Sequence, residues 1–594
     1  MYLSRVQIVN FRNFEALDVT LDQNVVMVGE NRSGKSNFIY ALRLVLDASL
    51  PDSSRQLKLS DIWDGCELSG APSVRIDVDL TDFDADPNLV ALLTDYRLSA
   101  NHETARLSYV FRKKGDVQGQ ATSEADFEFK VYGGGIESKR VHGDVRRRIC
   151  LDLLHALRDA EADLGAWRFS PLRPLLEDAI AQVPKGALDA VADDVSVATA
   201  RLGALEPVKD LETTLRDGIS ALSGPAQDLR ATLGFAPTDS LRLFRSIGLQ
   251  IDDGKRAIGD ASLGSANLAL LALKLEEFAW RRSKNERNFT IMCVEEPEAH
   301  LHPHLQRRVF QKLFGEDAAT DRSLVLTTHS PNVASVSPLG SIVLLRATDT
   351  HGTHAFSLAD LGLQPQEVED LQRYLDTTRA EVLFSRGVVF VEGDAEAALV
   401  PVFADTLKSN LDEAGVSICS VGGVHFRPYV KLALALNIPF AVITDWDPMD
   451  GSVPPLGRKR SIDLLSDIQQ ASEGRELDAI ARTALEEDDS ALRAKANEVG
   501  IFLNDATFEL EVAKTEGLVS TLIAVLDACG FGAKRTARLA AWQADPSTVD
   551  SEQLMSMISD VGKGRLAGRM AARAADVTPP GYIAGAIAHV VSRD

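Results

Sequence analysis

The sequence predicts an α/β protein with two sheet-based domains, the first of which is interrupted by a long helical segment. Three observations support this prediction. The chain has 594 residues, whereas a single hydrophobic core stops growing at about 250–300 residues. Short apolar runs that are typical of buried strands alternate with helical patterns in both the N-terminal and the C-terminal regions. Between them, residues 145–232 show helical periodicity only.

Composition limits the classes of function. The chain carries 63 basic and 86 acidic residues, a formal net charge of −23, which argues against a simple basic nucleic-acid coat or an electrostatic membrane binder. We find no signal peptide, and the longest apolar runs, such as Leu432–Ile443, are shorter than the ~20 residues of a spanning helix. The five cysteines are scattered and form no CxxC pair, which indicates reduced thiols in a cytoplasmic protein.

The helical segment carries a sustained apolar stripe. Apolar residues recur from Leu188 to Leu222 at steps of mostly three and four, as on one face of a helix. The stripe could be the core of an internal helical bundle or the seam of a dimerisation arm, because a heptad-like pattern predicts helix pairing without identifying the partner.

The first motif with a defined chemistry is GENRSGKS at residues 29–36, which follows the apolar run NVVMV and opens the helix-like run NFIYALRLVL. It fits the phosphate-binding pattern GxxxxGK[ST] in full and in the required strand–helix context. The glycines let backbone N–H groups converge on phosphates, and the helix N-terminus adds partial positive charge. Lys35 is expected to reach the β- and γ-phosphates and Ser36 to bind Mg²⁺. The expected nucleotide-binding residues of this segment are Gly29, Asn31, Gly34, Lys35, Ser36 and Asn37.

Two further strands end in residues that serve ATP hydrolysis. The run IMCVEEP at 291–297 is an apolar strand ending in two acids. Glu295 can hold Mg²⁺ through water, and Glu296 can orient or deprotonate the attacking water. The run LTTHSP places His329 after another apolar strand, where it resembles the switch histidine of ABC-type ATPases.

The segment SLGSAN at 262–267, which contains Ser265, resembles a degenerate ABC signature. The order of Walker A, long insertion, signature, Walker B and switch histidine resembles the ABC ATPases of the RecF/SMC type, as does NFRNF at 10–14. Because the signature of one subunit covers the nucleotide of another in that group, the resemblance implies a homodimer. For the Q-loop, Gln56 and Asp61 are candidates only.

A second group of acids lies in the C-terminal region. Glu392 follows the apolar run VVFV, Glu396 stands four residues on at a helix start, and Asp445 and Asp447 follow the apolar run FAVIT. The carboxyl ends of parallel strands meet at one edge of a sheet. Four carboxylates crowded there repel one another unless divalent cations neutralise them. An oxygen-only ligand set favours Mg²⁺ or Mn²⁺ over zinc.

This arrangement of acids resembles the Toprim fold of topoisomerases, primases and some nucleases. Together with the ABC-type ATPase and its helical insertion, it resembles the OLD (overcoming lysogenisation defect) family of ATP-dependent endonucleases over essentially the whole chain. A later "TLE" acid and a "KGRFA" lysine complete a two-metal nuclease site in that family. Here these motifs read TFE, with Glu509 preferred over Glu511, and KGRLA, with Lys563.

The resemblance implies four segments: a first ATPase segment at 1–145, a helical dimerisation insertion at 146–235, a second ATPase segment at 236–380, and a Toprim nuclease domain with a helical tail at 381–594. It implies two Mg²⁺ or Mn²⁺ ions per Toprim site and ATP with Mg²⁺ in the ATPase site. The metal ligands would be Glu392, Glu396, Asp445, Asp447 and Glu509, with Lys563 on the phosphate.

The implied function is a DNA endonuclease regulated by ATP, in anti-phage defence or DNA repair. Some family members neighbour a UvrD-like helicase, so such a partner is a candidate here. Two alternatives remain: a RecF-like DNA-binding repair protein whose Toprim domain does not cut, and an RNA-directed toxin nuclease. The acidic net charge does not exclude nucleic acid, because basic clusters at 458–460, 534–538 and 563–573 offer phosphate contacts.

Overall fold

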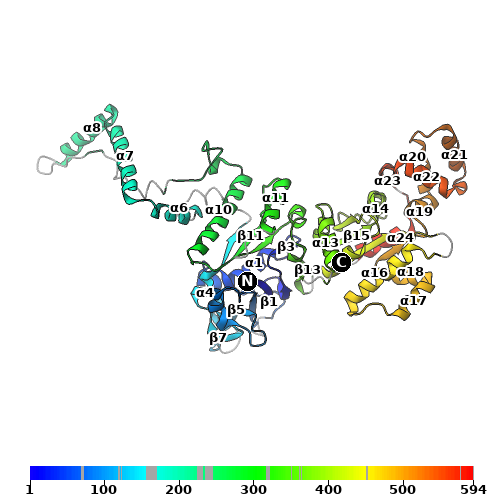
Figure 1. Cartoon of the computed structure of the whole chain (residues 1–594), viewed down its shortest axis with the longest axis horizontal. Coiled ribbons are helices and arrows are strands. Elements are labelled where there is room, and N and C mark those ends of the chain that lie inside the picture. Colours follow the sequence, from blue (N-terminus) through cyan, green and yellow to red (C-terminus); the bar gives the residue numbers. More distant parts are fainter. Residues whose placement is uncertain are drawn as a thin grey trace.

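The computed structural model describes the chain except for residues 68–71, 118–120, 122, 156–169, 224–231, 234–244, 246, 316–321, 349–350, 360–361, 363, 450–452, 576 and 593–594. The molecule is elongated (Figure 1): a pair of helices projects at one end, the large N-terminal sheet lies in the middle, and the C-terminal domain lies at the other end. No helix of the described residues is long and apolar enough to cross a membrane.

A twelve-stranded sheet forms the N-terminal domain. Its strands lie side by side in the order β7 (Ile136–Arg140), β6 (Phe127–Gly133), β5 (Ala105–Lys113), β4 (Val74–Thr81), β1 (Tyr2–Phe11), β2 (Phe14–Thr20), β14 (Gly352–Ser357), β13 (Ile342–Thr348), β3 (Val25–Gly29), β12 (Arg322–Thr327), β11 (Phe289–Glu295) and β8 (Ile149–Leu154). The pairs from β13 to β8 are parallel, and the others are antiparallel. The apolar runs VQIV, VVMV, VRIDVDL and ARLSYVF form parts of β1, β3, β4 and β5, so the strands predicted for the N-terminal region are present.

Side chains of the central strands alternate between two cores, as the two-residue period of a strand requires. In β3, Val26 and Val28 belong to one core, whereas Val25 and Met27 belong to the core on the opposite face. Helices cover the two faces of this sheet. They include α1 (Lys35–Leu46), α2 (Asp52–Arg55), α3 (Pro87–Leu93), α4 (Gly143–Arg148), α10 (Leu263–Ser283), α11 (Pro303–Phe314) and α12 (Pro331–Ala334).

The expectation that residues 145–232 are helical throughout is wrong at Ile149–Leu154. These residues form β8, which pairs in parallel with β11 at the edge of the sheet. An apolar run of this length cannot be told from a buried helix by periodicity alone. The helical insertion therefore follows Leu154, and its predicted end at 235 lies outside the described residues.

The insertion contains α6 (Leu172–Ala181), α7 (Lys185–Gly203) and α8 (Glu206–Ser223). Helices α7 and α8 project away from the sheet (Figure 1). Apolar side chains of the predicted stripe are about half exposed at Leu202, Leu211 and Leu215. Since α7 has no buried residue, the stripe is not the core of a bundle within the described residues of one chain.

The C-terminal domain is built on a parallel four-stranded sheet in the order β16 (Val416–Ser420), β15 (Gly387–Val391), β17 (Phe440–Thr444) and β18 (Ile501–Leu503). Its helices are α14 (Asp394–Thr406), α15 (Arg427–Ala435), α16 (Leu456–Glu473), α17 (Ala479–Glu487), α18 (Asp489–Glu498), α19 (Phe508–Lys514), α20 (Leu518–Asp527), α21 (Ala533–Ala544), α22 (Ser551–Val561), α23 (Lys563–Ala571) and α24 (Gly581–Val591). The helix-rich tail predicted from the sequence is thus confirmed.

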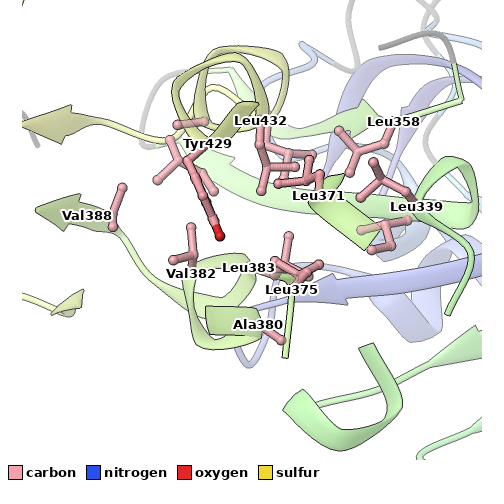
Figure 2. Close-up of a cluster of buried hydrophobic side chains, with 14 of the residues drawn as sticks. Leu339, Leu358, Leu371, Leu375, Ala380, Val382, Leu383, Val388, Tyr429 and Leu432 are labelled. Carbon is pink, nitrogen blue, oxygen red and sulfur yellow. The ribbon is translucent and has the colours of Figure 1, made fainter. Parts of the chain in front are cut away.

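The two domains share one hydrophobic core. The core on the Val26 face of the first sheet continues through α13 (Pro365–Tyr374) and residues 375–384 to Val388 and Phe390 of β15. Figure 2 shows the junction: Leu371, Leu375 and Leu383 lie between Leu339 and Leu358 of the N-terminal domain and Tyr429 and Leu432 of the C-terminal domain. Because apolar burial drives this packing, the domains are joined by more than a linker.

Leu383→Ala tests this shared core. Leu383 is 0% exposed, so the truncation should cost about 2–5 kcal/mol of unfolding free energy through lost burial and the cavity left behind. Denaturant unfolding should show the destabilisation, and Leu407→Ala is the control because Leu407 is 36% exposed. An equal, small effect of both substitutions would contradict a tightly packed junction.

Candidate functional site

The predicted phosphate-binding loop links β3 to α1, as its motif requires. Gly34 has φ +97°, and a Cβ there would lie 2.2 Å from the Asn13 amide, so the loop needs glycine at this point. Lys35 Nζ donates hydrogen bonds to the carbonyl oxygens of Gly29 (2.9 Å) and Glu30 (2.8 Å). Burial lowers the pKa of Lys35 to about 8. The ammonium group is thus held across its own loop, where phosphate oxygens would bind.

The remaining residues of the loop differ in their surroundings. Asn31 and Ser36 are exposed. Both ends of the Asn37 amide are used within the protein, because Oδ1 accepts from Arg12 (2.8 Å) and Nδ2 donates to Asn13 (2.6 Å). Asn37 therefore ties α1 to the NFRNF segment.

The Walker B acids and the switch histidine lie beside this loop. Glu295 ends β11, and Glu296 follows it in the left-handed region, with φ +43°. His329, after β12, has its Nε2 atom 4.0 Å from Glu296 Oε1. Burial and then the Lys35 charge lower the pKa of His329, while Glu296 opposes this. Lys35, Glu296 and His329 are therefore close enough to influence one another electrostatically.

The signature segment forms the N-terminus of α10. Ser262 caps this helix by accepting from the backbone N–H of Ser265 (3.3 Å), and Ser265 is exposed. A Cβ at Gly264 would lie 2.4 Å from the His300 carbonyl oxygen, so glycine allows the signature to pack on the loop after Walker B. A second subunit could contact the signature because Ser265 is exposed.

Both Q-loop candidates use their side chains in contacts within the protein. The Gln56 side chain donates to the carbonyl oxygens of Glu124 and Phe127, and Asp61 pairs with Arg12 at 2.9 Å. The strand order also places the end of β8 beside the Walker B strand β11. There His155 Nδ1 lies 3.2 Å from Glu295 Oε2. Only strand pairing could reveal this histidine, because no sequence motif surrounds it.

The sheet of the C-terminal domain brings the second group of acids together. Glu392 follows β15, and Asp445 and Asp447 follow the neighbouring strand β17. Glu396 lies in the first turn of α14, and Glu509 lies in the first turn of α19. These residues come from separate segments that converge only because the strands are parallel.

Hydrogen bonds connect these acids. Glu392 Oε1 accepts from Thr444 Oγ1 (2.6 Å) and from the Asp445 backbone N–H (2.9 Å). Asp445 Oδ1 accepts from Asn504 Nδ2 (2.5 Å) and from the Phe508 N–H (2.9 Å), which fixes the start of α19. Lys563, the first residue of α23, lies 3.0 Å from Glu509. The contact is made by Glu509 and not by Glu511, which pairs with Lys514.

Two of the acids have pKa values raised above those of ordinary carboxyl groups. Burial, followed by the charges of Asp445, Glu392 and Glu509, raises the pKa of Glu396 to about 8. Burial and the Glu392 charge raise the pKa of Asp445 to about 7. Crowded carboxylates of this kind form a site that a cation would stabilise.

The donor set fits a divalent cation in its chemistry, because it consists of carboxylate oxygens without histidine or cysteine. Among the described residues, however, no three acidic, histidine or cysteine side chains converge closely enough to hold one ion. Arg460 explains some of this. Its guanidinium donates to Glu392 Oε1 (2.6 Å) and Asp447 Oδ2 (2.8 Å), so a protein cation stands where the acids would otherwise meet a metal ion.

Sequence reasoning missed this position of Arg460 and the role of Asn504. The sequence predicts phosphate contacts for the cluster at 458–460, yet Arg458 pairs with Asp489 at 2.8 Å and Arg460 lies among the acids. Asn504 also accepts from the Trp446 N–H (2.9 Å). Its only signal is a polar residue after the apolar run IFL. Lys534, Arg565 and Arg573 remain exposed in the other two basic clusters.

Comparison with known proteins agrees with this architecture. Residues 383–447 match the family described as "Overcoming lysogenization defect protein-like, TOPRIM domain", and residues 1–127 and 205–334 match "AAA ATPase domain". The interruption between the last two ranges contains β8 and helices α6 and α7.

Relatives match over most of the chain. An OLD nuclease of Thermus scotoductus is 26% identical over 474 residues, which cover 75% of this chain and 83% of that protein. Endonuclease GajA of Bacillus cereus is 22% identical over 551 residues, 88% of this chain and 90% of that protein. The solved C-terminal region of the Burkholderia pseudomallei OLD protein is 38% identical, with a TM-score of 0.30, and covers 35% of this chain and 98% of that one.

The chain has an ATPase domain that a helical insertion interrupts, followed by a Toprim domain, and it is homologous to OLD nucleases across both domains. We conclude that the chain belongs to the OLD (overcoming lysogenization defect) family.

Proposed function

We propose that the protein is a metal-dependent DNA endonuclease controlled by ATP, with a role in anti-phage defence or DNA repair. The observation that carries the proposal is the set of Glu392, Glu396, Asp445, Asp447 and Glu509 at one edge of the Toprim sheet, with Lys563 beside Glu509. A repair clamp that only binds DNA has no need of five such acids next to a lysine. Two bound Mg²⁺ or Mn²⁺ ions would supply an activated water and positive charge at the leaving oxygen.

The chain's own residues have separate roles in this chemistry. Asp445 is fixed by Asn504 and by the N-terminus of α19, and Glu392 is fixed by Thr444. Lys563, whose side chain is 52% exposed, can turn from Glu509 to the phosphate and offset the charge that develops on it. DNA is the preferred polymer because the ATPase half resembles the RecF/SMC type, whose members act on DNA; the same acids would also serve RNA.

Contacts between the domains support control by ATP. Arg386, next to β15, binds Glu30 of the phosphate-binding loop through two hydrogen bonds of 2.6 and 3.1 Å. Arg346, at the end of β13, donates to the carbonyl oxygens of Arg386 and Asn437. A cavity of about 640 Å³ lies between the loop and this contact. The loop carbonyl that Lys35 holds belongs to the same Glu30, so a nucleotide that draws Lys35 away changes this link.

A homodimer completes the proposed ATPase. Ser265 of the signature is exposed, and we propose that it covers the nucleotide of a second subunit, as in ABC-type ATPases. The exposed stripe on α7 and α8 gives this dimer a second contact, because half-exposed leucines spaced along two helices favour burial against a like surface. A UvrD-like helicase remains a candidate further partner.

Glu509→Gln and Glu511→Gln form a matched test of the nuclease site, since both residues lie in α19. With supercoiled plasmid and Mn²⁺, Glu509→Gln should lower the cleavage rate at least about 100-fold, because it removes charge from the acid cluster. Glu511→Gln, whose acid pairs with Lys514, should stay within about threefold. Chelation of the metal should abolish cleavage by the parent protein.

The same assay with RNA distinguishes the alternatives. Preferential cleavage of RNA would support the toxin nuclease. Binding of DNA without any cleavage by the unmodified protein would support the repair clamp.

Arg386→Ala tests the link between the sites. ATP hydrolysis should persist, whereas Lys35→Ala should abolish it. The change that ATP causes in the plasmid cleavage rate should shrink by up to about fivefold in Arg386→Ala, because an exposed ion pair contributes at most about 1 kcal/mol. An undiminished ATP effect in Arg386→Ala would exclude this route.

The double substitution Leu211→Glu and Leu215→Glu tests the arm. Both side chains are about half exposed, so the monomer fold should tolerate charge there, whereas a dimer seam should not. Light scattering after gel filtration should show a lower dimer fraction than in the parent chain. Dimer content unchanged by the substitutions would place the subunit contact elsewhere.

A further inference from the structure

Arg460 is a largely buried cation inside the proposed nuclease site. Its side chain is 9% exposed and bridges acids that follow two different strands. Nη1 lies 2.6 Å from Glu392 Oε1 and 3.3 Å from the Asp445 carbonyl oxygen, and it also donates to Thr444 Oγ1. Nη2 lies 2.8 Å from Asp447 Oδ2. One guanidinium fork thus serves both acidic motifs of the Toprim sheet.

The backbone holds this arginine in place. Arg460 lies in the second turn of α16, and α16 packs directly on the segment that carries the acids. A Cβ at Gly457 would lie 2.4 Å from the Asp445 carbonyl oxygen, so only glycine permits this approach. The N–H groups of Leu456 and Gly457 donate to the carbonyl oxygens of Asp447 and Trp446. The position of Arg460 is therefore a property of the fold and not of a mobile surface chain.

A divalent ion and Arg460 cannot use these oxygens in the same way. The guanidinium donors occupy one oxygen each of Glu392 and Asp447, and two cations a few ångströms apart repel each other strongly where water is scarce. An arginine, unlike a lysine, cannot lose its charge to relieve this conflict. A phosphate, in contrast, offers the fork an equivalent pair of acceptors.

We propose that Arg460 competes with the divalent cation for Glu392 and Asp447, and that a DNA phosphate removes this competition by taking up the guanidinium. The inference deepens the proposed nuclease function and rests on it. Metal and DNA binding then strengthen each other, so the protein without DNA keeps its acids neutralised by its own arginine. Lys563 differs, because it contacts a single acid and is half exposed.

Mn²⁺ binding to the DNA-free protein is the direct test, with the signal of free Mn²⁺ in electron paramagnetic resonance as the readout. Arg460→Met should bind Mn²⁺ about tenfold more tightly than the parent chain, a typical coupling between two ligands. Arg458→Met is the matched control, because Arg458 lies on the same helix but pairs with Asp489; its Mn²⁺ affinity should be unchanged. Affinity in Arg460→Met equal to or weaker than that of the parent chain would overturn the proposal.

Addition of a short DNA duplex, checked on a gel for integrity, gives the second measurement. The duplex should tighten Mn²⁺ binding by the parent chain about tenfold and have little further effect in Arg460→Met. Arg460→Lys covers the case in which Arg460→Met does not fold, as judged by thermal unfolding. Lysine keeps the charge but lacks the planar fork that donates to both acids at once, so its Mn²⁺ affinity should lie above that of the parent chain, and equality would again refute the proposal. These Mn²⁺-binding measurements do not involve cleavage. If the expected affinity changes occur in a protein that cuts no DNA, only the proposed nuclease function is refuted and the proposal for Arg460 stands.

Discussion

Parallel strand pairing is the constraint on which both sites depend. In each sheet the chemistry-bearing residues follow strands whose carboxyl ends meet at one edge, the place where α/β proteins bind ligands. The phosphate-binding loop follows β3, Glu295 ends β11, and His329 follows β12. The Toprim acids follow β15 and β17 in the same manner. An antiparallel arrangement would send alternate motifs to opposite edges.

The shared core determines how the ligand-binding edges of the two sheets are placed relative to each other. Leu339 and Leu358 of the first domain and Tyr429 and Leu432 of the second bury against the same helix and the residues after it. Interfaces between domains are more often small and polar, which permits relative motion. Here the apolar packing holds the two domains together, so a change at the phosphate-binding loop acts on a C-terminal domain that is packed tightly against it. The contact between Glu30 and Arg386 lies at the exposed margin of that junction.

In both sites the basic side chains bind partners within the site, although the whole chain has a net charge of −23. Lys35 is hydrogen-bonded to carbonyl oxygens of its own loop, Lys563 to Glu509, and Arg460 to Glu392 and Asp447. Each basic group is thus already bound to the protein in the place that a ligand would use. In the proposed function, ligand binding in either site exchanges an internal partner for a phosphate or a metal ion, which couples binding to small rearrangements.

Much of the architecture follows from local sequence. The GENRSGKS loop and the EE and DxD strand ends are short motifs whose spacing reflects one strand or one helical turn, so they could be recognised without the fold. The KGRLA lysine could be recognised only through the resemblance to the OLD family. Strand β8 could not, because a six-residue apolar run next to a helical segment has no distinguishing period. The same holds for His155, whose approach to Glu295 depends on β8 lying beside β11.

The sequence by itself determined which residue types serve each site and which segments carry them. Only the tertiary structure decided their partners: the place of Arg460 between two acids, Asn504 on Asp445, Asn37 on Arg12, and the junction between the domains. The reason is physical. Motifs are set by contacts within a few residues, whereas these partners are 25 to 68 residues apart in most cases and meet only after the sheets have formed.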